Sequence, residues 1–153
     1  MSIKNLLFIY LLFSVLLFVG CRRAKIDNLV PARGIVTYNG EPVEGATIVF
    51  TPKNYKSGDR IGTGMTDKNG KFELQTIGEL GILPNEYSVA VIKRIAETEN
   101  NTKLPNNQIP KNTRPKVKIK SLIPERYSNA KTSGLNFIVD ENGLKNIKIE
   151  LVD

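Results

Sequence analysis

The chain has 153 residues, a formal net charge of +7 and no histidine, and 24% of its residues are charged. This length suits one domain, and the composition is neither that of a disordered chain nor that of collagen. The missing histidine removes the commonest general base near neutral pH and the commonest metal ligand, so we expect no enzyme activity, no metal site and no cofactor.

The first twenty residues differ from the rest of the chain. Residues 6–19 form an almost continuous apolar run, which ends at Gly20 and Cys21 and is followed by two arginines. A run of about fourteen residues is shorter than the roughly twenty that a bilayer-spanning helix needs, and it fits the apolar part of a secretory signal. An uncleaved membrane anchor and a buried helix are the alternatives. The short length of the apolar run favours a secretory signal over these alternatives.

Cys21 is the single cysteine of the chain, whereas a secreted domain held by disulfides would carry an even number. The stretch Phe18-Val19-Gly20-Cys21 resembles the lipobox of bacterial lipoproteins, whose signal is cut before a cysteine that has received a lipid. The resemblance implies a signal peptide at 1–20, lipidation of Cys21, and a cell-envelope location on the exported side of a membrane. Attached acyl chains bind a bilayer with roughly 0.8 kcal/mol per buried methylene.

The rest of the chain divides into a lipidated cysteine with a polar tether at 21–31 and one β-rich domain at 32–153. From Arg33 onward, short alternating runs are separated by turn residues every eight to twelve positions, which is typical of an all-β sandwich or barrel. We expect about seven strands. The clearest runs are 33–38, 46–51, 60–66, 71–76, 86–94, 132–140 and 146–151.

Within these runs the apolar side chains recur with a period of two, so one face of each strand is expected to enter the core. The residues predicted to point inward are Ala46, Ile48, Phe50, Phe72, Leu74, Tyr87, Val89, Val91, Ile147, Ile149 and Leu151.

Three Asn-Gly pairs predict turns, at 39–40, 69–70 and 142–143. The stretch Asp67-Lys68-Asn69-Gly70 also resembles the beginning of a calcium loop. In that frame Met65 would take the first ligand position and Thr76 the twelfth, where a glutamate is needed. A hairpin turn is therefore favoured, with positive φ angles at Asn69-Gly70 and with Asp67 accepting hydrogen bonds from nearby backbone amides.

A long flexible loop is expected at about 95–121, which is rich in Asn, Thr, Lys and Pro. Its end, residues 116–120, alternates lysine with Val and Ile and suggests an edge strand. Lys116, Lys118 and Lys120 then have two interpretations. Lysines on an edge strand discourage aggregation between sheets. Alternatively, they contact anionic lipid headgroups or acidic envelope polymers beside the anchor, an interaction that salt would weaken.

Three segments in order, 34–52, 64–74 and 83–91, resemble the carboxypeptidase-regulatory-like domain. Residues 123–127 and 132–135 resemble the closing half of that domain in a group of bacterial lipoproteins. The resemblance implies a seven-stranded Greek-key β-sandwich of the transthyretin (prealbumin) type. It also implies a non-enzymatic, membrane-anchored envelope protein that acts as a structural or interaction module.

The alternative function is a β-sandwich module that binds carbohydrate or acidic polymer. Sugar platforms need exposed flat rings, and the chain has no tryptophan. Tyr38 and Tyr87 are predicted to face inward, which leaves Tyr55 and Tyr127 as candidate contacts. Besides the membrane, the expected partners are an envelope protein or a polysaccharide. Nucleic acid is not expected, because aromatic residues do not cluster among the basic ones.

Overall fold

The computed structural model describes residues 25–99 and 116–153. Over these residues the regular secondary structure consists of β-strands, apart from one short 3-10 helix, η1 (Glu125–Ser128). No helix in these two ranges is long and apolar enough to cross a membrane. The predicted signal peptide and Cys21 lie outside the described residues, as does the middle of the expected long loop.

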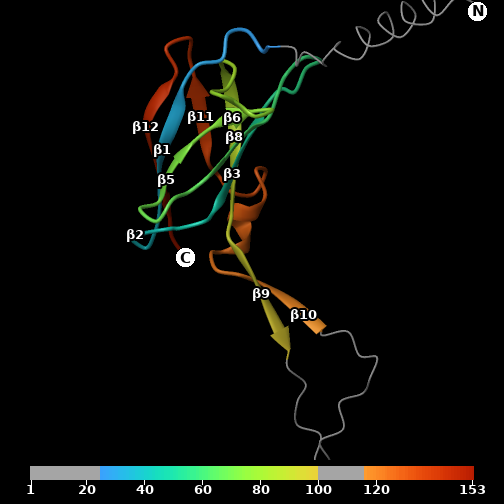
Figure 1. The fold of residues 1–153 in the computed structure, drawn as a ribbon, viewed down its shortest axis with the longest axis vertical. Coiled ribbons are helices and arrows are strands. Elements are labelled where there is room, and N and C mark those ends of the chain that lie inside the picture. Colours follow the sequence, from blue (N-terminus) through green and yellow to red (C-terminus); the bar gives the residue numbers. More distant parts are fainter. Residues whose placement is uncertain (1–24, 100–115) are drawn as a thin grey trace, which may run out of the picture.

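The first sheet is centred on β1, and the second has six strands (Figure 1). In the first sheet, β1 (Ala32–Tyr38) pairs with β12 (Leu144–Leu151) on one edge and with β2 (Glu41–Pro42) and β5 (Lys71–Glu73) on the other. The second sheet has the order β11 (Asn136–Val139), β8 (Asn85–Ile92), β3 (Thr47–Pro52), β4 (Gly62–Met65), β6 (Gln75–Thr76) and β7 (Glu79–Leu80). A separate two-stranded ladder joins β9 (Arg94–Glu99) and β10 (Lys116–Ser121).

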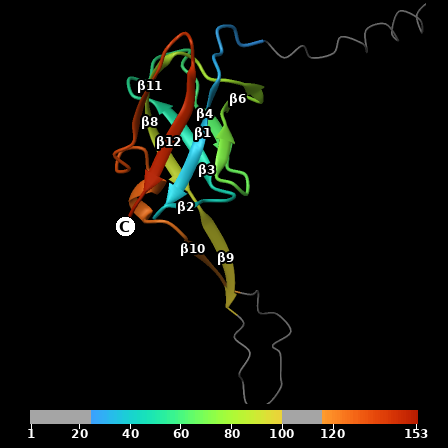
Figure 2. The same cartoon turned by 90° about the vertical axis from the view of Figure 1, so that its left-hand side faces the viewer.

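The two larger sheets enclose one hydrophobic core. Figure 2 looks onto β12 and β1, with β3 and β8 of the second sheet behind them. The predicted alternation is confirmed from Ala46 to Leu151, because every side chain in that predicted set is at most 4% exposed. Tyr38, also predicted to face inward, is only partly buried against the core. At about 25 cal/mol for each square ångström of apolar surface removed from water, this shared interior is the main stabilising contribution to the fold.

The pairing of β1 with β12 is parallel, whereas the other strand pairs of the described chain are antiparallel. Strands far apart in sequence therefore lie side by side: Val36 is opposite Ile149, and Tyr38 is opposite Leu151. Alternation alone does not predict such a partner, since it gives the face of a strand and not its neighbour.

The run 71–76, predicted as one strand, is divided between the two sheets. Lys71–Glu73 pairs with β1, whereas Gln75 pairs with Thr63 of β4. The change of sheet occurs at Leu74, whose amide donates to the Ala32 carbonyl at 2.8 Å while its side chain stays fully buried. One continuous period of two is preserved across this crossing, which explains why the sequence pattern resembles that of a single strand.

All three Asn-Gly pairs form turns, and at the third the Gly143 amide donates to the Asp140 carbonyl at 3.0 Å. At the first, Asn39 and Gly40 have φ angles of 50° and 90°, as a tight hairpin between β1 and β2 requires. At the second, Gly70 has a φ of 73° and Asn69 does not have a positive φ, so the prediction of two positive angles was wrong there. The Gly70 amide donates to the Asp67 carbonyl at 2.9 Å, and the turn carries the chain from β4 to β5, in the other sheet.

Asp67→Ala is expected to lower the free energy of unfolding by about 1 kcal/mol. The Asp67 Oδ1 atom accepts hydrogen bonds from the amides of Asn69 and Lys71 at 2.8 and 2.9 Å. The turn is exposed, so water can replace these bonds and limits the cost. Urea unfolding measures the change, with Lys68→Ala as the control in the same turn. A calcium-dependent rise in melting temperature that Asp67→Ala abolished would contradict the assignment as a turn.

Candidate functional site

The described chain begins beside the β6–β7 end of the second sheet. Val30 forms a bridge with Ile82, and the Ile26 amide donates to Glu79 Oε2 at 3.4 Å. These contacts fix the end of the body at which the expected tether enters. Cys21, the predicted lipidation site, precedes the described residues.

The β9–β10 hairpin lies at the opposite end of the body. From Asn85, close to Ile82 in the chain, β8 runs for eight residues, which spans about 25 Å at 3.3 Å per residue. Beyond Lys93, β9 adds six residues, or about 20 Å. Figures 1 and 2 both show the hairpin projecting away from the sheets, on the side remote from the beginning of the described chain.

The base of this hairpin is fixed to the body by two contacts. The Leu122 amide donates to the Lys93 carbonyl at 2.9 Å. Arg94 Nη2 and Glu125 Oε1 form an ion pair at 2.6 Å, which joins β9 to η1. Both partners are largely exposed, so we expect the pair to contribute at most about 1 kcal/mol. The pair links the base of the hairpin to η1.

The hairpin has one apolar face and one charged face. In its register Ile119 is opposite Ala96, and Lys118 is opposite Glu97. Val117 and Ile119 share a face by alternation and are 56% and 67% exposed. On the other face Lys120 Nζ lies 3.7 Å from Glu97 Oε1. The hairpin therefore presents aliphatic side chains to solvent without a covering layer in the described structure.

Residues 94–99 and 116–121 replace the ends of the loop that the sequence predicted at about 95–121. The Asn- and Pro-rich composition that suggested a loop belongs to the segment between the two strands, which lies outside the described residues. The flanks carry the β-branched residues Ile95, Val117 and Ile119, which favour strands. Averaging the composition over the whole range concealed β9, whereas the edge strand predicted at 116–120 is confirmed as β10.

The structure places the three predicted lysines on one strand, far from the start of the described chain. Lys118 and Lys120 are exposed, and Lys116 is the first residue of β10, although its side chain is not described. In the described structure β10 and the residues around Lys25 therefore lie at opposite ends of the body. β10 pairs with β9 alone within the described ranges, as expected for an edge strand.

The two candidate tyrosines differ in accessibility. Tyr55 is 62% exposed in the loop between β3 and β4, so its ring is free to contact a ligand. Tyr127 is only 5% exposed, with the Arg126 guanidinium 4.6 Å from its ring centroid. Its hydroxyl oxygen also accepts a hydrogen bond from the Val152 amide at 3.1 Å. The ring of Tyr127 therefore packs inside the fold, and only a small part of it is accessible from solvent.

Ser133, two residues from Lys131 in the sequence, has a structural role and not that of a nucleophile in a Ser–Lys pair. Its hydroxyl donates to the Val89 carbonyl at 2.6 Å and accepts from the Leu135 amide at 3.1 Å. The side chain is buried, and its hydroxyl both donates and accepts a hydrogen bond within the fold. It therefore stabilises the junction before β11. Lys131 is exposed and forms no hydrogen bond with it in the described structure.

Tyr87 is a buried tyrosine with a strongly shifted pKa. It is fully buried, its hydroxyl donates to the Leu83 carbonyl at 2.7 Å, and burial, with a smaller effect of the Asp59 charge, raises its pKa to about 12. Between pH 10 and 12 the folded protein therefore keeps a proton that the unfolded chain loses. Stability should fall as the pH rises through this window.

Tyr87→Phe tests this dependence. The substitution removes the titrating hydroxyl, so the decline in stability between about pH 10 and pH 12 should become shallower. At neutral pH the variant should be less stable by about 1–2 kcal/mol, because the Leu83 carbonyl loses its donor. Urea unfolding across pH 8–12 measures both effects, with Tyr55→Phe as the matched control. An unchanged slope in Tyr87→Phe would contradict the assignment.

Residues 32–103 match the model of a domain of unknown function, DUF6795. The matched range extends from β1 into the residues beyond β9, and it does not include β10, β11 or β12. No curated protein matches the chain. Among solved structures, the chain is similar to the crystal structure of a 9R-lipoxygenase from Cyanothece PCC8801, with 13% sequence identity and a TM-score of 0.33. The match covers 92% of this chain and 19% of the lipoxygenase chain, and a likeness this low carries no functional argument.

Proposed function

We propose that the protein is a bacterial envelope lipoprotein, cut before Cys21 and held at a membrane by lipid on that cysteine. Its β-domain is proposed to be a non-enzymatic module that binds a partner protein. The segments that resemble the carboxypeptidase-regulatory-like domain support a Greek-key sandwich of the transthyretin type. The seven strands with three or more residues in the two enclosing sheets are in accord with it: β1, β3, β4, β5, β8, β11 and β12.

One observation carries the proposed binding role, namely the β9–β10 hairpin with its exposed apolar face. A two-stranded ladder without a covering layer is marginally stable in water. Val117 and Ile119 would gain burial if a partner covered them. The position of the hairpin, remote from the end where the tether enters, is suited to a partner on the side away from the anchoring membrane.

The partner we propose is a protein with an apolar strip inside an acidic surface. Residues 94–121 contain seven basic and two acidic residues, so this part of the chain has a net charge of +5. Two copies of it would repel each other, which disfavours self-association. Aliphatic side chains are also poor sugar platforms, because glycans need flat rings. Charge complementarity and the apolar face together favour an acidic protein surface.

Site-specific photo-crosslinking in intact cells tests this role. A photoreactive amino acid replaces Ile119 in one strain. In the control strain it replaces Ile77, which is 62% exposed in the turn between β6 and β7. We expect a discrete protein adduct from position 119, absent from position 77 and weakened by Lys118→Glu. No adduct at position 119, or the same adducts from both positions, would exclude the hairpin as the binding element.

Cys21→Ala tests the anchor separately. The variant is expected to lose the mass of the acyl chains and to leave the membrane fraction, because a single domain without lipid has no comparable attachment. Intact-mass measurement and fractionation are the readouts, with Ser2→Ala as a control in the same segment. A native protein whose Cys21 carries no lipid would contradict this part of the proposal and leave the crosslinking result independent of it.

A further inference from the structure

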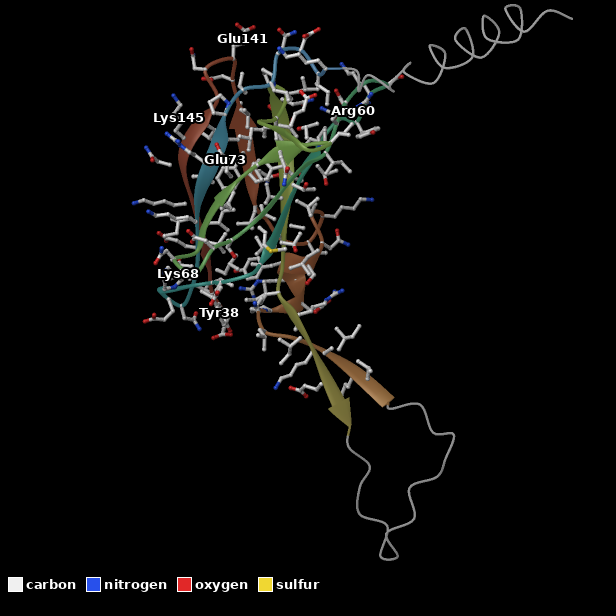
Figure 3. All side chains as sticks on the ribbon, viewed as in Figure 1. Tyr38, Arg60, Lys68, Glu73, Glu141 and Lys145 are labelled. Atoms are coloured by element: carbon white, nitrogen blue, oxygen red, sulfur yellow. The ribbon has the colours of Figure 1, made fainter. Side chains whose placement is uncertain are left out.

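The outer face of the first sheet contains a depression of about 570 Å³. It spans β5, β1 and β12 on the side turned away from the core. The residues that matter for its chemistry are Arg33, Ile35, Lys71, Asn146 and Lys148. Figure 3 shows Glu73 and Lys145 beside the strands that form it. This face is distinct from the hairpin described above.

Strand register brings three cations around one apolar side chain. Ile35 is opposite Lys71 on β5 and opposite Lys148 on β12, so the two lysines flank it on the same face. Neighbouring strands lie about 4.8 Å apart, which places the lysine Cα atoms about 10 Å from each other. Arg33 lies two residues before Ile35, on the same face and about 7 Å away along β1.

A β-bulge in β12 lies at one end of the depression, where Asn146 lines it. Between Ala32 and Gly34 the register with β12 shifts from Leu144 to Ile147, so β12 has an extra residue there. Asn146 lies in this bulge with a φ of 66°, which is uncommon for a residue other than glycine. Bulges leave backbone groups unpaired and redirect side chains, and they are enriched next to binding sites.

The three cations are available to an external anion. None of Arg33, Lys71 and Lys148 forms an ion pair with another residue in the part of the chain that the structure describes. Glu73 is opposite Arg33 in the register, and the two form no ion pair there. Lys145, also exposed, adds positive charge at the bulge.

Edge protection accounts for only part of this arrangement. Lys71 and Lys148 lie on strands with one free edge, where lysines discourage aggregation. Arg33 lies on the central strand, which is paired on both edges, so it has no edge to protect. Nor does edge protection require the bulge at Asn146. A common role in binding accounts for all of these features.

We propose that this depression binds a phosphate group of an organic ligand. Arg33, Lys71 and Lys148 would contact the phosphate oxygens, and Ile35 would pack against the adjoining carbon skeleton. Three positive charges around one site match the charge of a phosphate monoester, which approaches −2, better than that of a single carboxylate. The phosphate can belong to a free sugar phosphate or to a lipid headgroup, and this inference does not depend on the proposed hairpin function.

The test uses the native full-length protein in neutral detergent. Glucose phosphate is titrated while backbone amide shifts are followed by NMR, and mixed micelles containing phosphatidic acid, also a phosphate monoester, form a second arm. We expect saturable shifts at residues 33–35, 71 and 146–148. The Lys71→Gln/Lys148→Gln variant should bind about tenfold more weakly, since each exposed charge contact contributes up to about 1 kcal/mol.

The control variant is Lys56→Gln/Lys131→Gln, which removes the same charge from exposed lysines elsewhere and should bind as the native protein does. Glu73→Gln should strengthen binding, because it removes the nearby negative charge. Shifts with phosphatidic acid micelles alone would assign the phosphate to a lipid headgroup. Absence of shifts in both arms, or equal weakening by the two double variants, would overturn the proposal.

Discussion

Replacing Gly34 by alanine is expected to lower the free energy of unfolding by about 3 kcal/mol or more. A Cβ atom at this position would lie 2.5 Å from the Ile147 Cβ and closer still to the Ile147 carbonyl oxygen. The obstacle is largely backbone, which cannot rotate away as a side chain can. The close approach of β1 and β12 at the bulge therefore depends on the absence of a side chain at Gly34.

Gly134→Ala is the matched control for this prediction. Gly134 has a φ of 73°, and nothing lies within 4 Å of the position that a Cβ atom would occupy there. Its replacement should cost only the strain of a left-handed residue, about 1 kcal/mol. Urea unfolding of both variants separates steric overlap from backbone strain. Equal costs for the two substitutions would show that β1 and β12 can move apart easily.

Phe50→Ala is expected to cost about 3–5 kcal/mol, because it opens a cavity at the centre of the second sheet. Phe50 is fully buried, and its ring centroid lies 5.6 Å from that of Tyr87 and 5.7 Å from that of Phe137. Removing the ring loses its transfer free energy and both aromatic contacts. A domain with a typical stability of about 5–15 kcal/mol would be left close to unfolding.

Thermal and urea unfolding measure the effect of Phe50→Ala. Ile138→Ala provides the control, since Ile138 is 69% exposed on β11 and its truncation should change the stability by less than about 0.5 kcal/mol. If Phe50→Ala does not fold, Phe50→Leu reports the same site with a smaller cavity. A cost below about 1 kcal/mol for both Phe50 variants would contradict the assignment of this ring to the core.

The sequence predicted local features of the fold well because they depend on neighbours in the chain. The burial of Ile48 and Phe50 follows from alternation, and the turn at Asn39-Gly40 follows from the backbone preferences of those residues. The partner of each strand does not follow in the same way. The parallel contact of β1 with β12 depends on how segments far apart in the chain assemble.

The candidate surfaces were harder to predict for the same reason. Lys71 and Lys148 are distant in the sequence and are brought to either side of Ile35 only by the register of three strands. Tyr127 resembles an ordinary turn residue in the sequence, because its contacts with Val152 depend on where the last strand ends in space. In the hairpin, the alternation of valine and isoleucine with lysines predicted the strand β10. It also indicated that one face of this strand is apolar and the other is charged.

The parallel contact of β1 with β12 also has a kinetic consequence. Val36 and Ile149 are separated by most of the domain, so the loop that their contact closes is among the longest that this chain can form. Closing it costs chain entropy before any burial compensates, and proteins dominated by such contacts fold slowly. During synthesis, β1 therefore cannot complete this edge of its sheet until β12 has emerged. The first strand of the domain is completed by the last.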